Sequence, residues 1–280
     1  MIHHEYSWES DDLTRLYGQS WMPDDGPRAV INYVHGFKDH SSRMERWAIR
    51  FTQNGFGLIA LDLRGHGRSE GRRGYARGFR SYLEDVHTLR KNALNYFGNV
   101  PHILFGHSLG GNIVANYLIT KDLQPKAAII TSPWFTLADR PPLFVTTLAH
   151  VARIVLPNRV MKSDLDAEKL SHDPEVAADY RNDPLVHNFI LPRLYFDIER
   201  YGMLASRSIY KINVPILVMQ GTADRITSYR QTRDFVMHAG NLTTFKDWPG
   251  AYHELHNETC EREVFNYMLQ WLGTQLFSKS

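Results

Sequence analysis

The chain has 280 residues, 43% hydrophobic and 22% charged, which is ordinary for a globular protein with a sizeable core. Its 32 basic and 30 acidic residues give a formal net charge of +2, so charge gives no reason to expect a nucleic-acid partner. One cysteine excludes an intramolecular disulfide framework and a multi-cysteine metal site. The polar start lacks the apolar core of a secretory signal, and no stretch reaches the roughly 18 apolar residues of a membrane span. We therefore expect a cytoplasmic protein.

Short runs rich in Ile, Val and Leu alternate with helical patterns along most of the chain. Runs that are apolar throughout are typical of strands covered on both faces, as in a parallel sheet. The predicted strands are 29–34, 58–61, 102–105, 127–130 and 214–219. Apolar residues at three- and four-residue spacing predict an amphipathic helix over 79–97 and a C-terminal helix from 261, with a buried helix over 113–118. This alternation predicts an α/β fold with a doubly wound sheet.

The alternation stops between about Trp134 and Tyr210, where prolines are frequent and no strand is predicted. Within this segment we expect a helix bounded by Pro142 and Pro157, apolar over most of its surface. Its apolar positions are Phe144, Leu148, Val151 and Val155. The helix either packs on its own segment or forms a lid that contacts acyl chains or a membrane surface, and both can hold at once.

The strongest local signal is the pentapeptide Gly-His-Ser-Leu-Gly at 106–110, which follows a predicted strand and precedes a predicted helix. Glycines on both sides let the backbone turn sharply, so that the Ser108 hydroxyl stands exposed above the sheet. In this context the pattern predicts a nucleophilic serine. A serine hydroxyl needs a base to take its proton, and the acid and base that complete the set follow it in the order Asp or Glu, then His.

Asp224 is the favoured acid because it lies just beyond the predicted strand 214–219, where such sheets place reactive groups. Asp247, at the end of the run 243–245, remains a competitor. Other acids are weaker because they precede Ser108 or lie in the interrupted segment, namely Asp62, Asp183 and Asp197.

Three histidines follow Asp224, and His253 is favoured as the base because it lies in a loop before the last helix. His238 lies in a helical pattern, and His256 is better placed to cap or pack.

Acyl transfer also needs two backbone N–H groups directed at the developing oxyanion. Leu109 supplies one, and Phe37, in the loop after the first predicted strand, supplies the other, with His35 and Gly36 shaping the turn. Contacts to the substrate are predicted from His35, Gly36, His107, Phe144, Leu148 and Val151.

Five motifs resemble those of the monoacylglycerol lipase and lysophospholipase group of α/β-hydrolases, and they occur in the order found in that group. They are His35-Gly36, the octapeptide at 62–69, the hexapeptide at 106–111, Ala223-Asp224 and the pentapeptide at 252–256, and the hexapeptide at 171–176 and the pentapeptide at 182–186 are similar too. The resemblance spans about 30–258 and implies a mostly parallel central sheet flanked by helices, with a largely helical cap after the sixth strand. It also implies the triad Ser108, Asp224 and His253 and ester hydrolysis without cofactor or metal. Phe37 departs from the small residue common at its position.

The motif order favours one α/β-hydrolase core, 1–133 and 211–280, interrupted by a cap at 134–210. We expect a serine carboxylester hydrolase that forms an acyl-enzyme and acts on a monoacylglycerol, a lysophospholipid or a similar lipid-like ester. The alternatives are a thioesterase, an aminopeptidase, an acyltransferase or a non-enzymatic binding module. We also expect peripheral membrane contact through the cap. Six arginines at 64–80 form either a solvated surface or a site for an anionic headgroup.

Overall fold

The computed structural model describes residues 1–98, 100–139, 142–156 and 158–277. Its described residues form one sheet of eight strands in the order β1-β2-β4-β3-β5-β6-β9-β10. The strands are β1 (Ile2–Glu9), β2 (Arg15–Met22), β3 (Ala29–Val34), β4 (Phe56–Leu61), β5 (His102–His107), β6 (Ala127–Thr131), β9 (Ile216–Gly221) and β10 (Thr243–Trp248). Strand β2 runs antiparallel to both β1 and β4, and the remaining pairs are parallel. The mostly parallel α/β sheet predicted from the sequence is confirmed.

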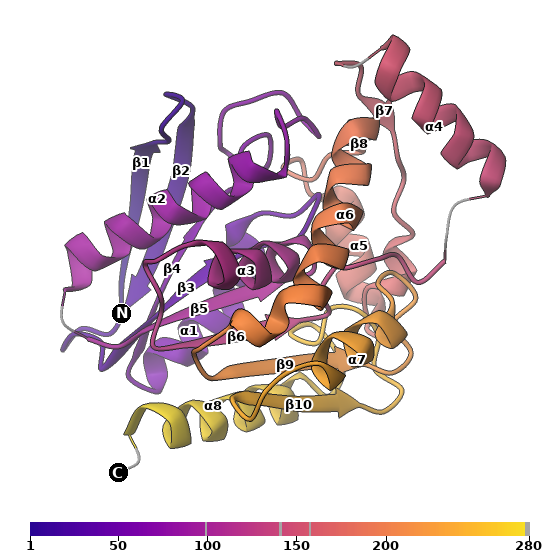
Figure 1. Ribbon diagram of the computed structural model, residues 1–280. Coiled ribbons are helices and arrows are strands. Elements are labelled where there is room, and N and C mark those ends of the chain that lie inside the picture. Colours follow the sequence, from indigo (N-terminus) through magenta and orange to yellow (C-terminus); the bar gives the residue numbers. More distant parts are fainter. Residues whose placement is uncertain (99, 140–141, 157, 278–280) are drawn as a thin grey trace.

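Helices cover both faces of this sheet (Figure 1). On one face lie α1 (Glu45–Gln53) and α8 (Glu261–Phe277), and on the other lie α2 (Phe79–Phe97), α3 (Leu109–Thr120) and α7 (Tyr229–Met237). Alternate side chains of β3 enter the two cores: Ile31 and Tyr33 pack toward α1 and α8, whereas Val30 and Val34 pack toward α2 and α3. A strand buried on both faces must be apolar at every position, which explains the continuous runs.

The sheet extends further than the predicted strands at both of its edges. The hairpin β1–β2 and the strand β10 have no counterpart among the five strands that we predict. Strand β1 is mostly exposed and β10 is half-buried throughout, because each is the last strand at its edge. Edge strands bury little surface, so their sequences need no apolar run. Strand β9 begins at Ile216, two residues later than predicted.

The chain between β6 and β9, for which the sequence predicts a cap, is largely helical. It contains α4 (Leu143–Val155), η2 (Ala167–Lys169), α5 (Pro174–Asn182), α6 (Pro192–Ser208) and η3 (Ile209–Lys211). Two short strands that we did not predict, β7 (Met161–Lys162) and β8 (Phe189–Ile190), pair with each other. Helix α4 matches the predicted helix, although Pro157, its expected boundary, lies outside the described residues. No helix in the described ranges is long and apolar enough to cross a membrane.

Candidate active site

Ser108 occupies the sharp turn between β5 and α3. Its backbone has φ 55° and ψ −116°, a left-handed conformation that non-glycine residues rarely adopt. A Cβ on Gly106 would lie 2.3 Å from the Gly110 carbonyl oxygen, and one on Gly110 would lie 2.1 Å from that of Val34. Both positions therefore need glycine for the turn to close. The strain at Ser108 is consistent with a functional site, where such backbones are concentrated.

His253 and Asp224 lie side by side beyond the ends of β10 and β9. His253 Nδ1 donates a 2.9 Å hydrogen bond to Asp224 Oδ2, and both side chains are buried. The other Asp224 oxygen accepts from the N–H groups of Ile226 (2.8 Å) and Thr227 (3.0 Å). With Nδ1 as donor, the imidazole presents Nε2 as the acceptor that a base needs.

The buried carboxylate and imidazole change each other's proton affinity. Burial alone would lower the pKa of His253, but the Asp224 charge and hydrogen bond outweigh it and raise this pKa above its ordinary value. Burial would raise the pKa of Asp224, but His253 and the two backbone N–H donors lower it. Asp224 therefore stays ionised, and His253 becomes a base once the pH exceeds its raised pKa.

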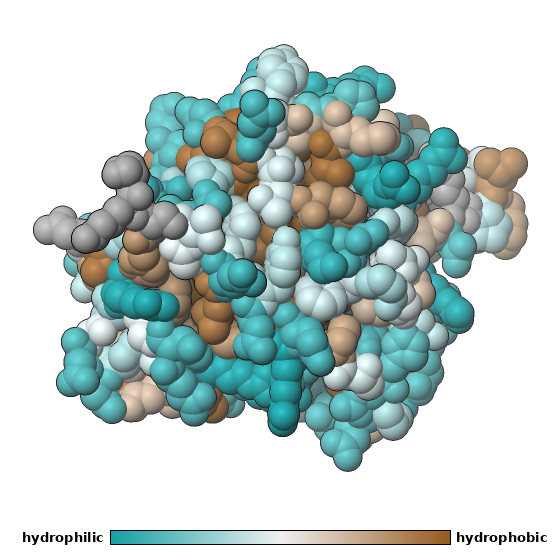
Figure 2. All heavy atoms as spheres, turned by 90° about the horizontal axis from the view of Figure 1, so that it is seen from below, coloured by the Kyte–Doolittle hydropathy of each residue, from teal (hydrophilic) through white to brown (hydrophobic). Residues whose placement is uncertain are grey.

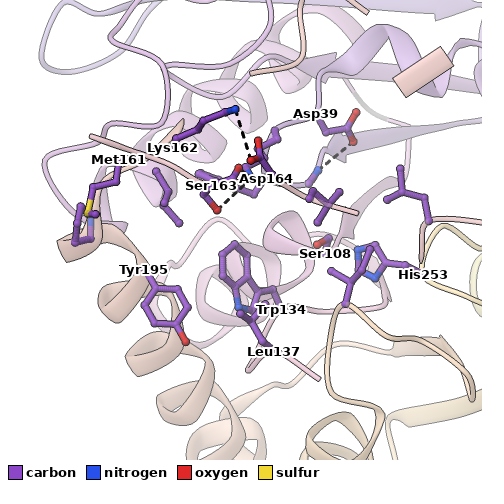
Figure 3. A pocket seen from close by; sticks show the side chains of 18 of the residues that line it. Asp39, Ser108, Trp134, Leu137, Met161, Lys162, Ser163, Asp164, Tyr195 and His253 are labelled. Carbon is purple, nitrogen blue, oxygen red and sulfur yellow. Dashed lines mark hydrogen bonds and ion pairs between the residues drawn. The ribbon is translucent and has the colours of Figure 1, made fainter. Parts of the chain in front are cut away.

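Ser108 and His253 face the same cavity of about 320 Å³ and lie together at one end of it (Figure 3). Trp134 forms part of its wall, and Met161 and Tyr195 lie toward its far end. Within the described residues no hydrogen bond joins Ser108 Oγ to His253, a contact that often tightens only when substrate binds. The cavity can therefore hold a reacting group against both side chains.

The peptide between Gly36 and Phe37 has a fixed orientation. Leu63 N–H donates to His35 Nε2 (2.9 Å), so His35 Nδ1 carries the proton and donates it to the Gly36 carbonyl oxygen (2.7 Å). In a trans peptide the N–H points opposite to the C=O, so His35 also sets the direction of the Phe37 N–H. A Cβ on Gly36 would lie 3.2 Å from that of Ser108, which places this peptide next to the nucleophile.

Most of the predicted site residues either line the cavity or are buried close to it in the chain. Those lining the cavity are Gly36, Phe37, His107, Ser108, Leu148 and His253. His35, Leu109 and Asp224 are buried and do not line it.

Phe144 and Val151 do not lie where we expected. They are 74% and 52% exposed and do not line the cavity, because α4 turns Val145, Thr146 and Ala149 toward it instead. Helical spacing identified the helix but carries no information on which face meets the cavity.

Sequence reasoning missed several polar residues that hold the acid and the base. The Gln220 amide and the Thr227 hydroxyl donate to Asp224 Oδ2 (2.9 and 2.8 Å), and the Ser132 hydroxyl donates to the His253 carbonyl oxygen (2.7 Å). Thr227 follows Asp224 by three residues, so a search for short-range donors could have found it. Ser132, 121 residues before His253, gives no such signal.

The six arginines lie away from the reactive cavity. Arg64 is buried and pairs with Asp85 and Asp12, and it lines, with Arg72 and Arg77, a separate cavity of about 540 Å³. None of the six lines the cavity at Ser108. Among the described residues, no group of three His, Cys, Asp or Glu side chains could hold a metal ion.

Comparison with known proteins identifies the family to which this fold and site belong. Residues 25–260 match the family described as serine aminopeptidase, S33. The monoacylglycerol lipase of Mycolicibacterium smegmatis is 32% identical over 274 residues, covering 97% of this chain and 98% of that protein. The monoglyceride lipase of Homo sapiens is 30% identical over 265 residues, covering 92% and 86%. A soluble variant of Saccharomyces cerevisiae monoglyceride lipase, in complex with a substrate analog, has a TM-score of 0.87 at 21% identity, covering 99% and 97%.

The sheet and these matches define an α/β-hydrolase of the group that includes the monoacylglycerol lipases. More narrowly, the chain belongs to the serine aminopeptidase S33 family. It is a serine hydrolase of the lipase and esterase type.

Proposed function

We propose that the chain is a carboxylester hydrolase that cleaves monoacylglycerols through an acyl-enzyme. The observation that carries this proposal is the 2.9 Å hydrogen bond from His253 to Asp224 beside a cavity that also exposes Ser108. The monoacylglycerol lipases among its relatives support the choice of substrate.

In the first step Ser108 Oγ attacks the ester carbonyl carbon while His253 Nε2 takes the hydroxyl proton. The N–H groups of Phe37 and Leu109 bind the oxyanion, and Asp224 stabilises the imidazolium. His253 then returns the proton to the departing alcohol. In the second step His253 takes a proton from water, the hydroxide attacks the acyl carbon, and the fatty acid leaves as Ser108 recovers its proton.

The cavity is suited to one acyl chain. Its volume of about 320 Å³ lies near the lower end of the roughly 300–1,000 Å³ of ligand pockets, which favours a single-chain lipid. Its lining includes side chains with apolar surface: Trp134, Leu137, Val145, Leu148, Met161, Ile190 and Tyr195. The Phe37 ring narrows the cavity. It packs edge-to-face against Trp134, with the two ring centroids 5.7 Å apart.

The charged residues of the cavity favour an uncharged headgroup. Lys38 and Lys162 line it together with Asp39, Asp164 and Glu254. The two signs are mixed there, and Lys162 lies 3.7 Å from Asp164. The Lys38 ammonium donates to Ser163 and the three carboxylates are paired with Arg43 or Lys162, so a phosphate would find no cluster of cations, and an ammonium group no unpaired acidic cluster. This balance favours a glycerol ester over a lysophospholipid and over an aminopeptidase substrate.

A matched series of substrates tests the function. We expect hydrolysis of monoacylglycerols to exceed that of lysophospholipids, thioesters and aminoacyl amides of equal acyl length, and Ser108→Ala to remove all of it. Each added methylene that enters the cavity is expected to raise kcat/KM about fourfold, because burying it is worth about 0.8 kcal/mol. Faster turnover of a lysophospholipid or an amide would contradict the proposed substrate, and activity retained in Ser108→Ala would contradict the mechanism.

Helix α4 presents its apolar side to solvent. His150 stacks on Phe196 of α6 with ring centroids 4.0 Å apart, and Arg153 lies 5.1 Å from the same ring. The exposed apolar side chains of α4 include Leu143, Phe144, Val151, Ile154 and Val155. Apolar residues are visible at the projecting right-hand end of the molecule, where α4 lies (Figure 2). We therefore propose that this face contacts the surface of a membrane or lipid droplet that holds the substrate.

Leu143 and Ile154, 86% and 73% exposed, allow a test of this contact. We expect the double variant Leu143→Asp/Ile154→Asp to hydrolyse monoacylglycerol in vesicles at least tenfold more slowly, because a charged face loses its affinity for the lipid surface. Hydrolysis of a water-soluble short-chain ester should change less than twofold. Leu13→Asp, at an equally exposed apolar residue in the β1–β2 turn, is the control. Equal loss on both substrates would contradict membrane contact.

A further inference from the structure

Glu254 is a buried carboxylate directly beside the proposed base, and the mechanism above does not use it. It lines the cavity, and its side chain is 3% exposed. Its two oxygens accept from Arg43 Nη1 (2.8 Å) and Nη2 (2.9 Å), a bidentate pair. Arg43 belongs to η1 (Ser41–Met44), which follows the predicted oxyanion peptide in the chain. The pair therefore joins two segments 211 residues apart.

The same guanidinium also holds a second carboxylate. Arg43 Nη1 donates to Asp39 Oδ1 (3.2 Å), while Asp39 Oδ2 accepts from the Gly36 N–H (3.3 Å; Figure 3). Gly36 contributes the carbonyl group of the peptide whose N–H is that of Phe37. A continuous chain of polar contacts thus runs from the residue after His253 to the N–H of Gly36, one peptide before the peptide proposed to bind the oxyanion.

Burial makes this chain of contacts difficult to break. The Arg43, Asp39 and Glu254 side chains are 11%, 5% and 3% exposed. The ring of Tyr180 in α5 covers the guanidinium at 5.0 Å. Removing one partner from a buried ion pair leaves an uncompensated charge, so the intact geometry is strongly favoured over a loosened one.

We propose that Arg43 is a positioning residue that couples the base to the oxyanion site, using Glu254 to hold the loop of His253 and Asp39 to hold the N–H of Gly36, the residue whose carbonyl group belongs to the oxyanion peptide. This inference rests on the proposed function. Both halves of the site must keep their position relative to Ser108 while the oxyanion forms. An arginine can do this because its planar fork binds two carboxylates in fixed directions, which the single ammonium of a lysine cannot.

The coupling also has an electrostatic consequence. The charged and titratable groups around His253 are Asp224, Asp39, Glu254, Arg43, His107 and His256. Burial lowers the pKa of His253, whereas the charges of Asp224, Glu254 and Asp39 raise it. Removing the Arg43 cation should therefore raise this pKa further, and neutralising Glu254 should lower it. Because charges act on His253 whether or not they hold its loop, these shifts report that Arg43 and Glu254 lie near the base, and the positioning role is tested by the labelling rate of Arg43→Lys, which keeps the charge.

The test measures the rate at which a fluorophosphonate labels Ser108 between pH 5 and 9, and it requires no knowledge of the natural substrate. For Arg43→Met we expect labelling to slow about 100-fold, a typical consequence of a displacement of about 1 Å. In this variant the acid limb of the plot of labelling rate against pH should move to higher pH. Glu254→Gln should move the acid limb to lower pH. Arg43→Lys should restore the wild-type pH profile with only part of the rate, because it keeps the charge and loses the fork.

Arg50 provides a matched control, since it is also an arginine that makes a two-contact ion pair with a glutamate 211 residues later, Glu261. Its ion pair joins α1 to α8 and involves neither Asp39 nor the loop of His253, so Arg50→Met should lower the unfolding temperature without changing the labelling rate or its pH profile. A wild-type labelling rate in Arg43→Met, or a rate in Arg43→Lys equal to that of the wild type, would overturn the coupling. If wild-type Ser108 is not labelled at any pH, the proposed function fails and this inference fails with it.

Discussion

Replacing His253 with alanine is expected to lower kcat for ester hydrolysis about a million-fold, close to the loss expected for Ser108→Ala. The two residues act as one unit, because a serine hydroxyl attacks only as fast as a base removes its proton. The structure supports His253 as that base, since its Nδ1 is bound to Asp224 and its ring faces the cavity. The rate of acyl-enzyme formation, followed as the first turnover of a chromogenic ester, measures the loss directly.

His256 is the control because it is the other histidine that the sequence left open as the base. Its ring packs against His107 at 4.8 Å and Trp47 at 6.1 Å, and it does not line the cavity. We expect His256→Ala to lower the unfolding temperature, since it removes a buried ring, but to change kcat less than tenfold. If His256→Ala abolished turnover and His253→Ala retained it, the assignment of the base would be wrong.

The elements that could be predicted from the sequence are those whose burial or backbone geometry leaves a pattern in a short stretch of residues. Strand β3 is predicted residue for residue at Ala29–Val34 because both of its faces are buried. The turn at Ser108 is predictable because its glycines are demanded by contacts within one strand–turn–helix unit and with β3 beside it. The edge strand β1 escapes prediction because only one of its residues, Trp8, is buried.

Features that depend on tertiary contacts could not be predicted from the sequence. The spacing of Phe144 and Val151 indicates a helix. That both residues face outward becomes clear only from the structure, in which α6 packs against the polar side of α4. Likewise, Arg43 and Glu254 stand 211 residues apart and belong to no common motif. Nothing local distinguishes Arg43 from a solvated surface arginine, and its role becomes visible only when the sheet brings the two loops together.

Asp224→Asn is expected to lower kcat about 10⁴-fold while the protein stays folded. The carboxylate accepts hydrogen bonds at both oxygens: from Gln220, Thr227 and His253 side chains at Oδ2, and from two backbone N–H groups at Oδ1. An asparagine must turn its NH₂ group toward one of these sets of donors. If the NH₂ faces His253, it favours the tautomer whose Nε2 carries a proton, and this form cannot accept the proton of Ser108.

Asp247→Asn decides between the two acids that the sequence left open. Asp247 lies on the edge strand β10, accepts from the Tyr229 hydroxyl (2.9 Å) and does not line the cavity, so we expect the kcat of Asp247→Asn to differ from that of the wild type less than twofold.

The pH profile of Asp224→Asn separates loss of the acid from unfolding. Since the Asp224 charge and hydrogen bond raise the pKa of His253, the residual activity of Asp224→Asn should show an acid limb at lower pH than the wild type. Unfolding would lower the rate without moving this limb. A wild-type rate in Asp224→Asn together with a large loss in Asp247→Asn would reassign the acid.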